Sequence, residues 1–553
     1  MTPIVARPLP RDTQLSGARP AAERRTVPAP RPRAWREPFG VFAISFAAYG
    51  ALGLYTTLAL KIVLGDGESR LAHAYFTLWN TPGKLAAIGF YWPPMQTLAL
   101  IPFAAVRPLA TSLVALPIAS ALFAAAVLAT LDRALALAHG LPRRLRWAIV
   151  GAFGLNPMFL YFAVNGMGES LYLFFLTAGL FFFVRWTISP RWQDLLGAGV
   201  ALALGVLGRY EVGVWVVIVA AATLAILAAS RADAARIEAS VVALVAPTIY
   251  ALALWAFVNW TLTGRPASFL SVANAIEQPP HGTLVGFARQ TASIQLQLFP
   301  AVAAVALALS WIALRRRSIV ATALAAALVV NAFITIAFAY HAREDVPLLL
   351  RYNMRAMPLA IVAGAWLIAT TRHSRRTAAG VALLAGIVLS APATATIMLH
   401  SKNELGEASF LRGLATGQGQ DGRPGPHGPG LSIADQRSMA RWIVEHIQGR
   451  NQILADDSQT FGVMLADGDP GRYLDRIDYG DRTWFEIRDD PQGRVRYMLV
   501  KRGATASENR VFYDRILQRY STLGTPRPAP PFLQLVRQNG TFALYRVHPV
   551  RRY

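Results

Sequence analysis

Residues 41–64 read VFAISFAAYGALGLYTTLALKIVL, and the acidic stretch GDGESR follows directly at 65–70. The first stretch contains one charged side chain, that of Lys61. About 20 apolar residues in a helix cross the hydrocarbon core of a membrane, whereas a helix in a soluble core is seldom apolar on every face. The pattern therefore predicts a membrane-spanning helix that ends in an acidic loop at Gly65.

Similar apolar blocks recur along the chain, for example at 171–186, 212–229 and 320–340. Of the 553 residues, 54% are hydrophobic and 15% are charged, against about 25% charged in an ordinary soluble domain. The sequence therefore predicts a polytopic α-helical membrane protein.

The net charge of +23 comes mostly from arginine. In a soluble protein such a charge would suggest nucleic-acid binding. Here the arginines cluster between apolar blocks, where they set membrane topology, and we expect no nucleic-acid partner. The chain has no cysteine, which excludes disulfides, thiolate metal sites and a cysteine nucleophile.

Hydropathy predicts about eleven transmembrane helices. One further apolar stretch, Ile88–Val106, is left out because Trp92-Pro93-Pro94 breaks a helix, and we expect an interfacial or re-entrant segment there. The predicted spans are 39–64, 109–131, 147–164, 170–186, 193–208, 212–230, 239–261, 293–314, 318–340, 355–371 and 377–399.

The arginines test this choice of spans. With the N-terminus inside, every predicted inside loop is basic, as the positive-inside rule requires. If Ile88–Val106 crossed the membrane, all later loops would invert. Residues 1–37 are then a disordered cytoplasmic tail, residues 38–400 form the membrane domain, and residues 401–553 lie outside. The inside loops carry Arg133, Arg143, Arg144, Arg146, Arg185, Arg191, Arg231, Arg236, Arg315, Arg316, Arg317, Arg372, Arg375 and Arg376.

The remaining charges of the membrane domain fall on the outer face, several within a turn or two of an apolar span. Ionisable groups near hydrocarbon are costly and tend to mark functional sites. The alternative is that they are ordinary helix-end charges that reach for water. The acids are Asp66, Glu68, Glu169, Glu211, Glu277, Glu344 and Asp345, and the basic residues include Arg70, Lys84, Arg209, Arg265, Arg289, Arg343, Arg351 and Arg355.

This mixture of charges indicates a chemistry. Carboxylates act as general bases or bind metal ions, and arginines offer paired donors to phosphate. Together at the outer membrane surface they suit a reaction on a phosphate-bearing lipid. No motif in the chain is typical of a P-loop, a dinucleotide-binding fold or a zinc site, and no metal ligand is predicted.

Several short motifs within residues 40–400 are similar to those of one superfamily. The chain resembles the GT-C membrane glycosyltransferases, and within them the bacterial dolichyl-phosphate-mannose-protein mannosyltransferase-like family that includes the lipid A aminoarabinose transferases. The motifs are Leu64–Ala74 with its early acids, Tyr91-Trp-Pro-Pro-Met95, Asn156-Pro-Met158, Asn165–Tyr172, Gly208-Arg-Tyr-Glu211 and Leu350-Arg-Tyr352.

The resemblance implies inverting transfer of a sugar from a polyprenyl-phosphate donor to a lipid, glycan or protein acceptor, at the outer face of a bacterial inner membrane. It implies a first-loop base, which is Asp66 or Glu68, because Gly67 separates two acids that are often adjacent in the family. Some relatives use a divalent metal, so the cofactor stays open. Candidates for binding the substrates are Arg209, Arg351 and Arg355, then Arg70 and Lys84, together with Glu169 and Glu211.

Residues 401–553 differ in kind, because acids become frequent and Gly413–Gly430 reads as a linker. We expect a small α/β domain that caps the active site or holds the acceptor, with acids that are solvated loop charges. Its predicted elements are a helix at 434–447 capped by Ser432, strands at 451–455 and 496–500, a helix at 511–520, and a hairpin of 532–536 with 542–547 around Gln538-Asn539-Gly540.

Two other functions stay open. A transporter or flippase of lipid-linked sugars would use the same charges as a path, and would predict internal repeats and broken helices in the membrane. The sequence shows no repeat. A non-catalytic membrane scaffold would not need an Asp/Glu/Arg set at its helix ends.

Overall fold

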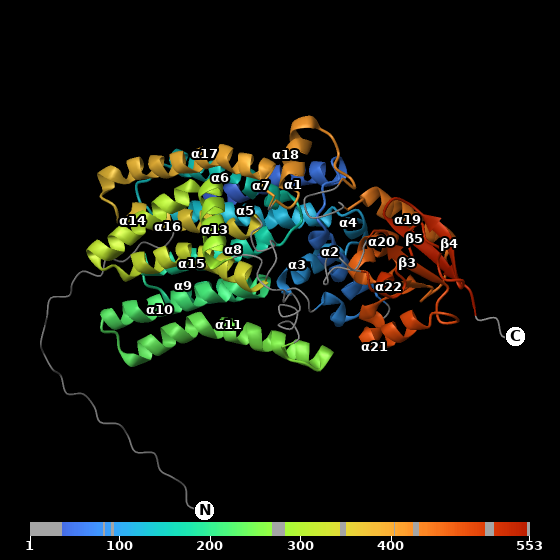
Figure 1. The fold of residues 1–553 in the computed structure, drawn as a ribbon. Helices are drawn as coiled ribbons and strands as arrows, with labels where there is room; N and C mark the ends of the chain where they lie inside the picture. Colours follow the sequence, from blue (N-terminus) through green and yellow to red (C-terminus); the bar gives the residue numbers. More distant parts are fainter. Residues whose placement is uncertain are drawn as a thin grey trace, which may run out of the picture.

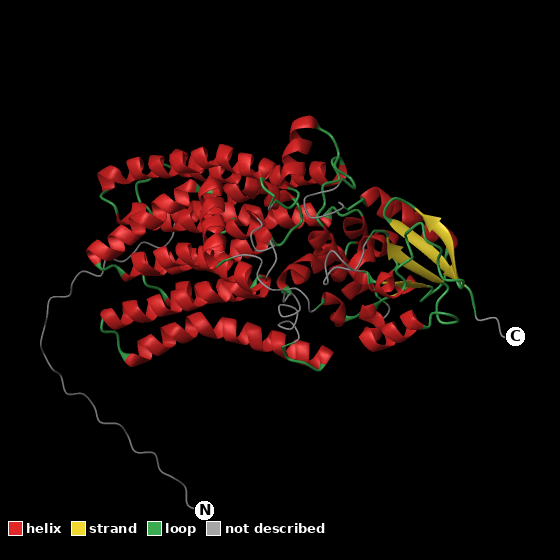
Figure 2. Cartoon of the chain, in the orientation of Figure 1, coloured by secondary structure: helices red, strands yellow, loops and turns green. Residues whose placement is uncertain are grey.

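The computed structural model describes residues 36–80, 83–89, 93–267, 283–342, 350–402, 404–423, 431–503 and 514–549. A bundle of long helices makes up most of it, and a smaller domain with a sheet lies at one end of the bundle (Figures 1 and 2). The candidates Glu277, Arg343, Glu344 and Asp345, and Tyr91-Trp92 of the double-proline motif, lie outside the described residues.

Eight described helices are long and apolar enough to cross a membrane, and up to ten spans result if each of two bent pairs counts as one. The chain is therefore a multi-pass membrane protein. The eight are α1 (Arg36–Leu58), α5 (Ala115–Ala136), α8 (Glu169–Ile188), α10 (Gly213–Ala229), α11 (Ala234–Thr263), α15 (Ile319–Ala342), α16 (Ala356–Thr370) and α17 (Arg376–His400).

The bent pairs are α6 (Arg143–Gly154) with α7 (Pro157–Val164), at 71°, and α13 (Leu284–Leu298) with α14 (Pro300–Arg316), at 105°. With the shorter apolar helix α9 (Trp192–Gly208), these elements match the predicted spans in order.

Two predicted spans, 147–164 and 293–314, are wrong as single helices because each contains one of these bends. The second helix of each pair begins with a proline, Pro157 or Pro300, which has no N–H for the preceding turn. Asn156 adds a cap to α7 by accepting from Met158 N. As a result α13 lies across the direction of its neighbours (Figure 1).

The segment between the first two spans forms α2 (Gly65–Trp79), η2 (Leu85–Ile88), α3 (Met95–Ala104) and α4 (Arg107–Thr111). The predicted acidic loop is thus the first turn of a helix, where acids interact well with the helix dipole. The 10 residues of α3 extend about 15 Å, too short to cross the hydrocarbon core.

The C-terminal domain contains a five-stranded sheet of order β2-β1-β3-β5-β4. β1 pairs in parallel with β2 and β3, and β5 pairs antiparallel with β3 and β4. The strands are β1 (Ile453–Ala455), β2 (Tyr473–Leu474), β3 (Tyr497–Lys501), β4 (Leu533–Gln538) and β5 (Phe542–Val547), and the helices are α18 (Glu407–Thr416), α19 (Ile433–His446), α20 (Asp457–Asp467), α21 (Arg476–Asp489) and α22 (Arg515–Arg519).

The predicted capped helix, two strands and hairpin are present, whereas α18, α20, α21 and β2 were missed. Several acids of this domain are not solvated, contrary to the prediction. Asp456 is buried and caps α20 by accepting from Ser458 N at 3.1 Å. Asp467 pairs with Arg472 at 3.0 Å. These carboxylates support the domain's own fold.

The domain is docked on α2 through a shared apolar core. Leu71 and Phe76 of α2 are buried in one cluster with Met439 of α19 and Val463 of α20. Burial of such side chains contributes about 1.5–3 kcal/mol each. Tyr75 of α2 adds a hydrogen bond by donating to the Gly468 carbonyl at 2.8 Å. Helix α2 and the C-terminal domain therefore pack as one body.

Candidate active site

Charged side chains from four parts of the membrane domain meet at the end of the bundle nearest α2. All of them stand where a helix begins or ends, because there the chain leaves the apolar stretch that precedes it. Asp66 lies in the first turn of α2, Glu169 begins α8, Arg209 ends α9, Glu211 lies in η3 (Tyr210–Val212), Arg351 lies in η5 (Leu350–Asn353) and Arg355 caps α16.

Asp66 and Arg351 form the first contact of this cluster. Arg351 Nη1 donates to Asp66 Oδ2 at 3.1 Å, and the Arg351 side chain is 8% exposed against 27% for Asp66. Burial alone would raise the pKa of Asp66, but Arg351 and Arg70 together hold it below its usual value. The carboxylate is thus ionised and partly open to a ligand.

Arg209 and Arg355 form a second, linked set of ion pairs. Arg209 donates to Glu169 Oε1 at 3.2 Å and to Glu211 Oε1 at 3.0 Å. Arg355 donates to the same Glu211 oxygen at 3.0 Å. Buried charges are tolerated only when they are paired in this way, so each residue here depends on its partners.

Aromatic rings and amides also contact the arginines of the cluster, and these residues were not singled out from the sequence. The Arg209 guanidinium lies 4.9 Å from the Tyr172 ring and 4.7 Å from the Tyr352 ring, close enough for cation–π attraction. Arg355 donates through Nε to Asn331 Oδ1. Tyr172 and Tyr352 lie inside the motifs noted above, which was the available signal, whereas Asn331 sits within an apolar block.

Several buried polar atoms of the cluster have no hydrogen-bond partner among the described residues. They are Glu169 Oε2, Arg351 Nε, Tyr172 OH and both side-chain polar atoms of Asn353. A buried group left unpaired costs about 1–3 kcal/mol. A polar ligand with both acceptors and donors would satisfy them.

The two candidate bases point to different parts of the molecule. Glu68 is 1% exposed and its Oε2 accepts from Gln436 Nε2 of α19 at 3.0 Å. Burial raises the pKa of Glu68 to about 7, although Gln436, Lys501 and Arg437 act in the opposite direction. Asp66 therefore belongs to the membrane-domain cluster and Glu68 to the interface with the C-terminal domain.

Arg70 and Lys84 are the two remaining cationic candidates. Arg70, one turn after Asp66, donates to Gln96 Oε1, and Gln96 donates to the Gly166 carbonyl at 3.2 Å. Arg70 also interacts electrostatically with Asp66. Lys84 is half-buried at the start of η2 and is not part of the ion pairs above.

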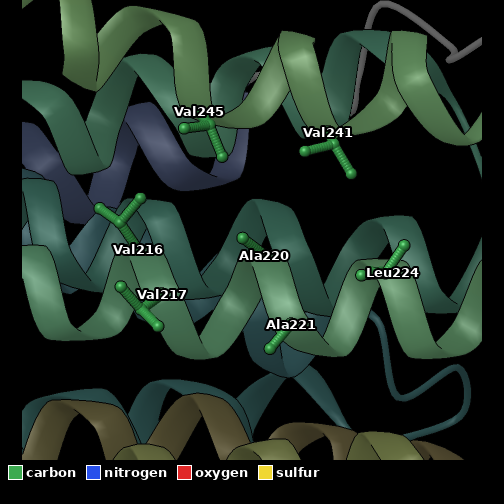
Figure 3. Close-up of a pocket in the computed structure, with 7 residues that line it drawn as sticks. All are labelled: Val216, Val217, Ala220, Ala221, Leu224, Val241 and Val245. Carbon is green, nitrogen blue, oxygen red and sulfur yellow. The ribbon is translucent and has the colours of Figure 1, made fainter.

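Within the described part of the chain, no three His, Cys, Asp or Glu side chains gather closely enough to hold a metal ion. An apolar pocket of about 330 Å³ lies between α10 and α11 (Figure 3). All its lining side chains are Ala, Val or Leu, so it has none of the charged groups of the cluster. They are Val216, Val217, Ala220, Ala221, Leu224, Val241 and Val245.

No protein-family model matches the chain, and no curated protein matches it. Among solved structures, it is similar to ArnT from Cupriavidus metallidurans bound to undecaprenyl phosphate. The TM-score is 0.55 at 12% sequence identity, over 91% of this chain and 98% of that chain. The apo structure of that ArnT gives 0.52 at 13% identity, over 92% and 98%. ArnT has the GT-C fold.

The chain has a GT-C fold. The predicted architecture of a polytopic helical domain followed by a small α/β domain is thereby confirmed. Because the match covers 91% of this chain, the GT-C likeness extends beyond the bundle into the C-terminal domain. At this level of identity the likeness establishes the fold alone.

Proposed function

We propose that this protein is a membrane glycosyltransferase that moves a sugar from a polyprenyl-phosphate donor to an acceptor hydroxyl at the outer face of a bacterial inner membrane. The observation that carries the proposal is the meeting of Asp66 with Arg351, next to the Arg209–Glu169–Glu211–Arg355 set. Support for the donor class comes from the fold, since ArnT was solved with undecaprenyl phosphate.

The proposed reaction is a direct displacement. Asp66 accepts the proton of the acceptor hydroxyl while the acceptor oxygen bonds to the anomeric carbon. The bond from that carbon to the phosphate oxygen breaks, and polyprenyl phosphate leaves with its electron pair. One displacement inverts the anomeric configuration.

Arg351 gives this scheme an order of events. While it pairs with Asp66, it keeps that carboxylate a weak base. A donor phosphate that draws the guanidinium to itself would raise the basicity of Asp66 only once the donor is bound. Arg209 and Arg355 would stabilise the charge that develops on the leaving phosphate.

The test is the variant Asp66→Asn, which keeps the size of the side chain and removes the base. We measure transfer from radiolabelled undecaprenyl-phosphate sugars with purified, folded enzyme. Turnover should fall by about 10²–10⁴-fold, with donor affinity maintained or improved, because Asn leaves Arg351 available. Near wild-type turnover would remove Asp66 as the base.

Transport of a lipid-linked sugar is the second candidate, since the two bent spans are a feature that a transporter predicts. The breaks in these two spans, however, are connected to each other by hydrogen bonds between uncharged groups. Asn156 donates to Thr394 Oγ1 at 3.2 Å, and Thr394 donates to the Leu298 carbonyl at 2.6 Å. This tie links both breaks to α17, and the charged cluster lies at the helix ends at one end of the bundle. Movement of labelled lipid between leaflets without sugar transfer would favour the transporter.

A further inference from the structure

Glu68 sits at the meeting point of α2, α19, α20 and β3. Besides its hydrogen bond from Gln436, it lies so close to α20 that a Cβ on Gly462 would come within 2.7 Å of Glu68 Oε1. Lys501, at the end of β3, contributes favourable electrostatics. The C-terminal domain thus holds the first turn of α2 through Gln436, which lies 368 residues from Glu68 in sequence.

The opposite side of the same turn is held by the membrane domain. A Cβ on Gly67 would lie 2.9 Å from the Gly166 carbonyl oxygen, so only glycine permits this approach without a shift. Asp66, Gly67 and Glu68 are therefore fixed in turn by Arg351, by the loop before α8, and by the C-terminal domain.

We propose that Glu68 is a positioning residue, which anchors the first turn of α2 to the docked C-terminal domain so that Asp66 faces the acceptor and Arg351. The C-terminal domain is then part of the catalytic assembly and not only a cap. This inference rests on the proposed function, because it assigns the base to Asp66.

The experiment compares four purified variants of the full chain. Glu68→Gln keeps an oxygen that accepts from Gln436, while Glu68→Ala and Gln436→Ala each remove one side of the bond. Tyr75→Phe is the matched control, because it removes a different hydrogen bond between α2 and the domain, at Gly468, away from the first turn. The readouts are turnover, donor affinity and deuterium exchange of the first turn of α2.

We expect both alanine variants to lose about 10²-fold in kcat, the size of effect that a displacement of about 1 Å produces, with unchanged donor affinity. The amides of residues 65–70 should exchange faster in both. Glu68→Gln should retain most of the turnover, and Tyr75→Phe should match wild type. Exchange is measured without any substrate, so it reports on positioning independently of the reaction.

Glu68→Gln as inactive as Asp66→Asn would overturn the proposal and make Glu68 the base. Glu68→Ala with wild-type exchange would also overturn it, whatever its turnover. If the wild-type enzyme transfers no sugar from any donor while exchange in the alanine variants rises, the anchoring role stands and the proposed function fails.

Discussion

Arg209 and Arg351 each pair with a carboxylate in a largely buried cluster, and in the proposed reaction both guanidinium groups bind the donor phosphate. Loss of a charge-assisted hydrogen bond costs about 1.5–3 kcal/mol, or roughly 10- to 150-fold in affinity. We therefore expect Arg209→Ala and Arg351→Ala to weaken binding of undecaprenyl phosphate by that factor, measured by direct titration.

The control for this measurement is Arg482→Ala, on the exposed face of α21, where the side chain is 93% exposed. It should bind like wild type. Unchanged affinity in both of the site variants would exclude Arg209 and Arg351 from donor binding.

Glu68 should make stability depend on pH. Its pKa rises from an ordinary 4.5 to about 7 because burial disfavours the charged form. The contribution to stability is therefore complete below about pH 4.5 and is lost as the pH rises through 7. A shift of that size corresponds to about 3 kcal/mol. Gln436 and Arg437 of α19, Lys501 of β3 and Gly462 of α20 face the carboxyl.

The measurement is the thermal unfolding midpoint of wild type and Glu68→Gln between pH 5 and pH 8. The glutamine introduced by the substitution carries no charge at any pH. The unfolding midpoint of the variant should therefore rise relative to that of wild type as the pH rises. A constant difference across this range would mean that Glu68 does not titrate there.

The choice between Asp66 and Glu68 could not be made from the sequence. The two residues are two positions apart on a helix, so their side chains are separated by a rotation of about 200° around the helix axis. The sequence does not say which of the two directions faces the site. The answer depends on Gln436, which only the docked domain brings to Glu68. The arginines were found because charge beside hydrocarbon is conspicuous, whereas Asn331 and Asn353 are neutral and were not.

At the scale of elements, the approach of α2 to the loop before α8 can be tested through Gly67. In Gly67→Ala the new methyl would meet the Gly166 carbonyl at 2.9 Å, so α2 must shift. Overpacking of this kind costs about 1–3 kcal/mol. We expect a lower unfolding midpoint and a reduced kcat, since Asp66 moves with the turn.

Gly151→Ala, in α6, is the matched control because nothing lies within 4 Å of its Cβ position. It should be neutral or stabilising, as alanine favours a helix by about 1 kcal/mol over glycine. If Gly67→Ala has the same unfolding midpoint and the same kcat as Gly151→Ala, the close approach of α2 to the Gly166 carbonyl has no role in the site.

Most helices could be predicted because a hydrocarbon core demands a fixed length of apolar residues. The bends at Leu155–Asn156 and Phe299 were missed because hydropathy does not register them, although Pro157 and Pro300 were the available signal. Within the C-terminal domain, the hairpin around Asn539 was predicted from its turn residues, while the two-residue strand β2 exists only through its pairing with β1.

At the scale of the whole molecule, several of the arginine-rich segments gather at one end of the bundle. Arg146 pairs with Glu37 at 2.7 Å, which brings the start of α1 to the loop before α6. Arg376 donates to the His139 carbonyl, which adds the loop before α17. The 20 residues of α8 place Glu169 about 30 Å from that helix's other end, where Arg185 pairs with Asp194.

The absolute orientation is the remaining prediction, and the absence of cysteine makes it directly measurable. We introduce single cysteines at three exposed described positions, His139→Cys, Ser374→Cys and Gln418→Cys. A membrane-impermeant maleimide added to spheroplasts with an intact inner membrane should label only Gln418→Cys. All three variants should react after the membrane is permeabilised. The reason is that arginine-rich loops stay on the cytoplasmic side. Labelling of Ser374→Cys in intact spheroplasts would invert the molecule and put Asp66 on the wrong face for an extracytoplasmic transferase.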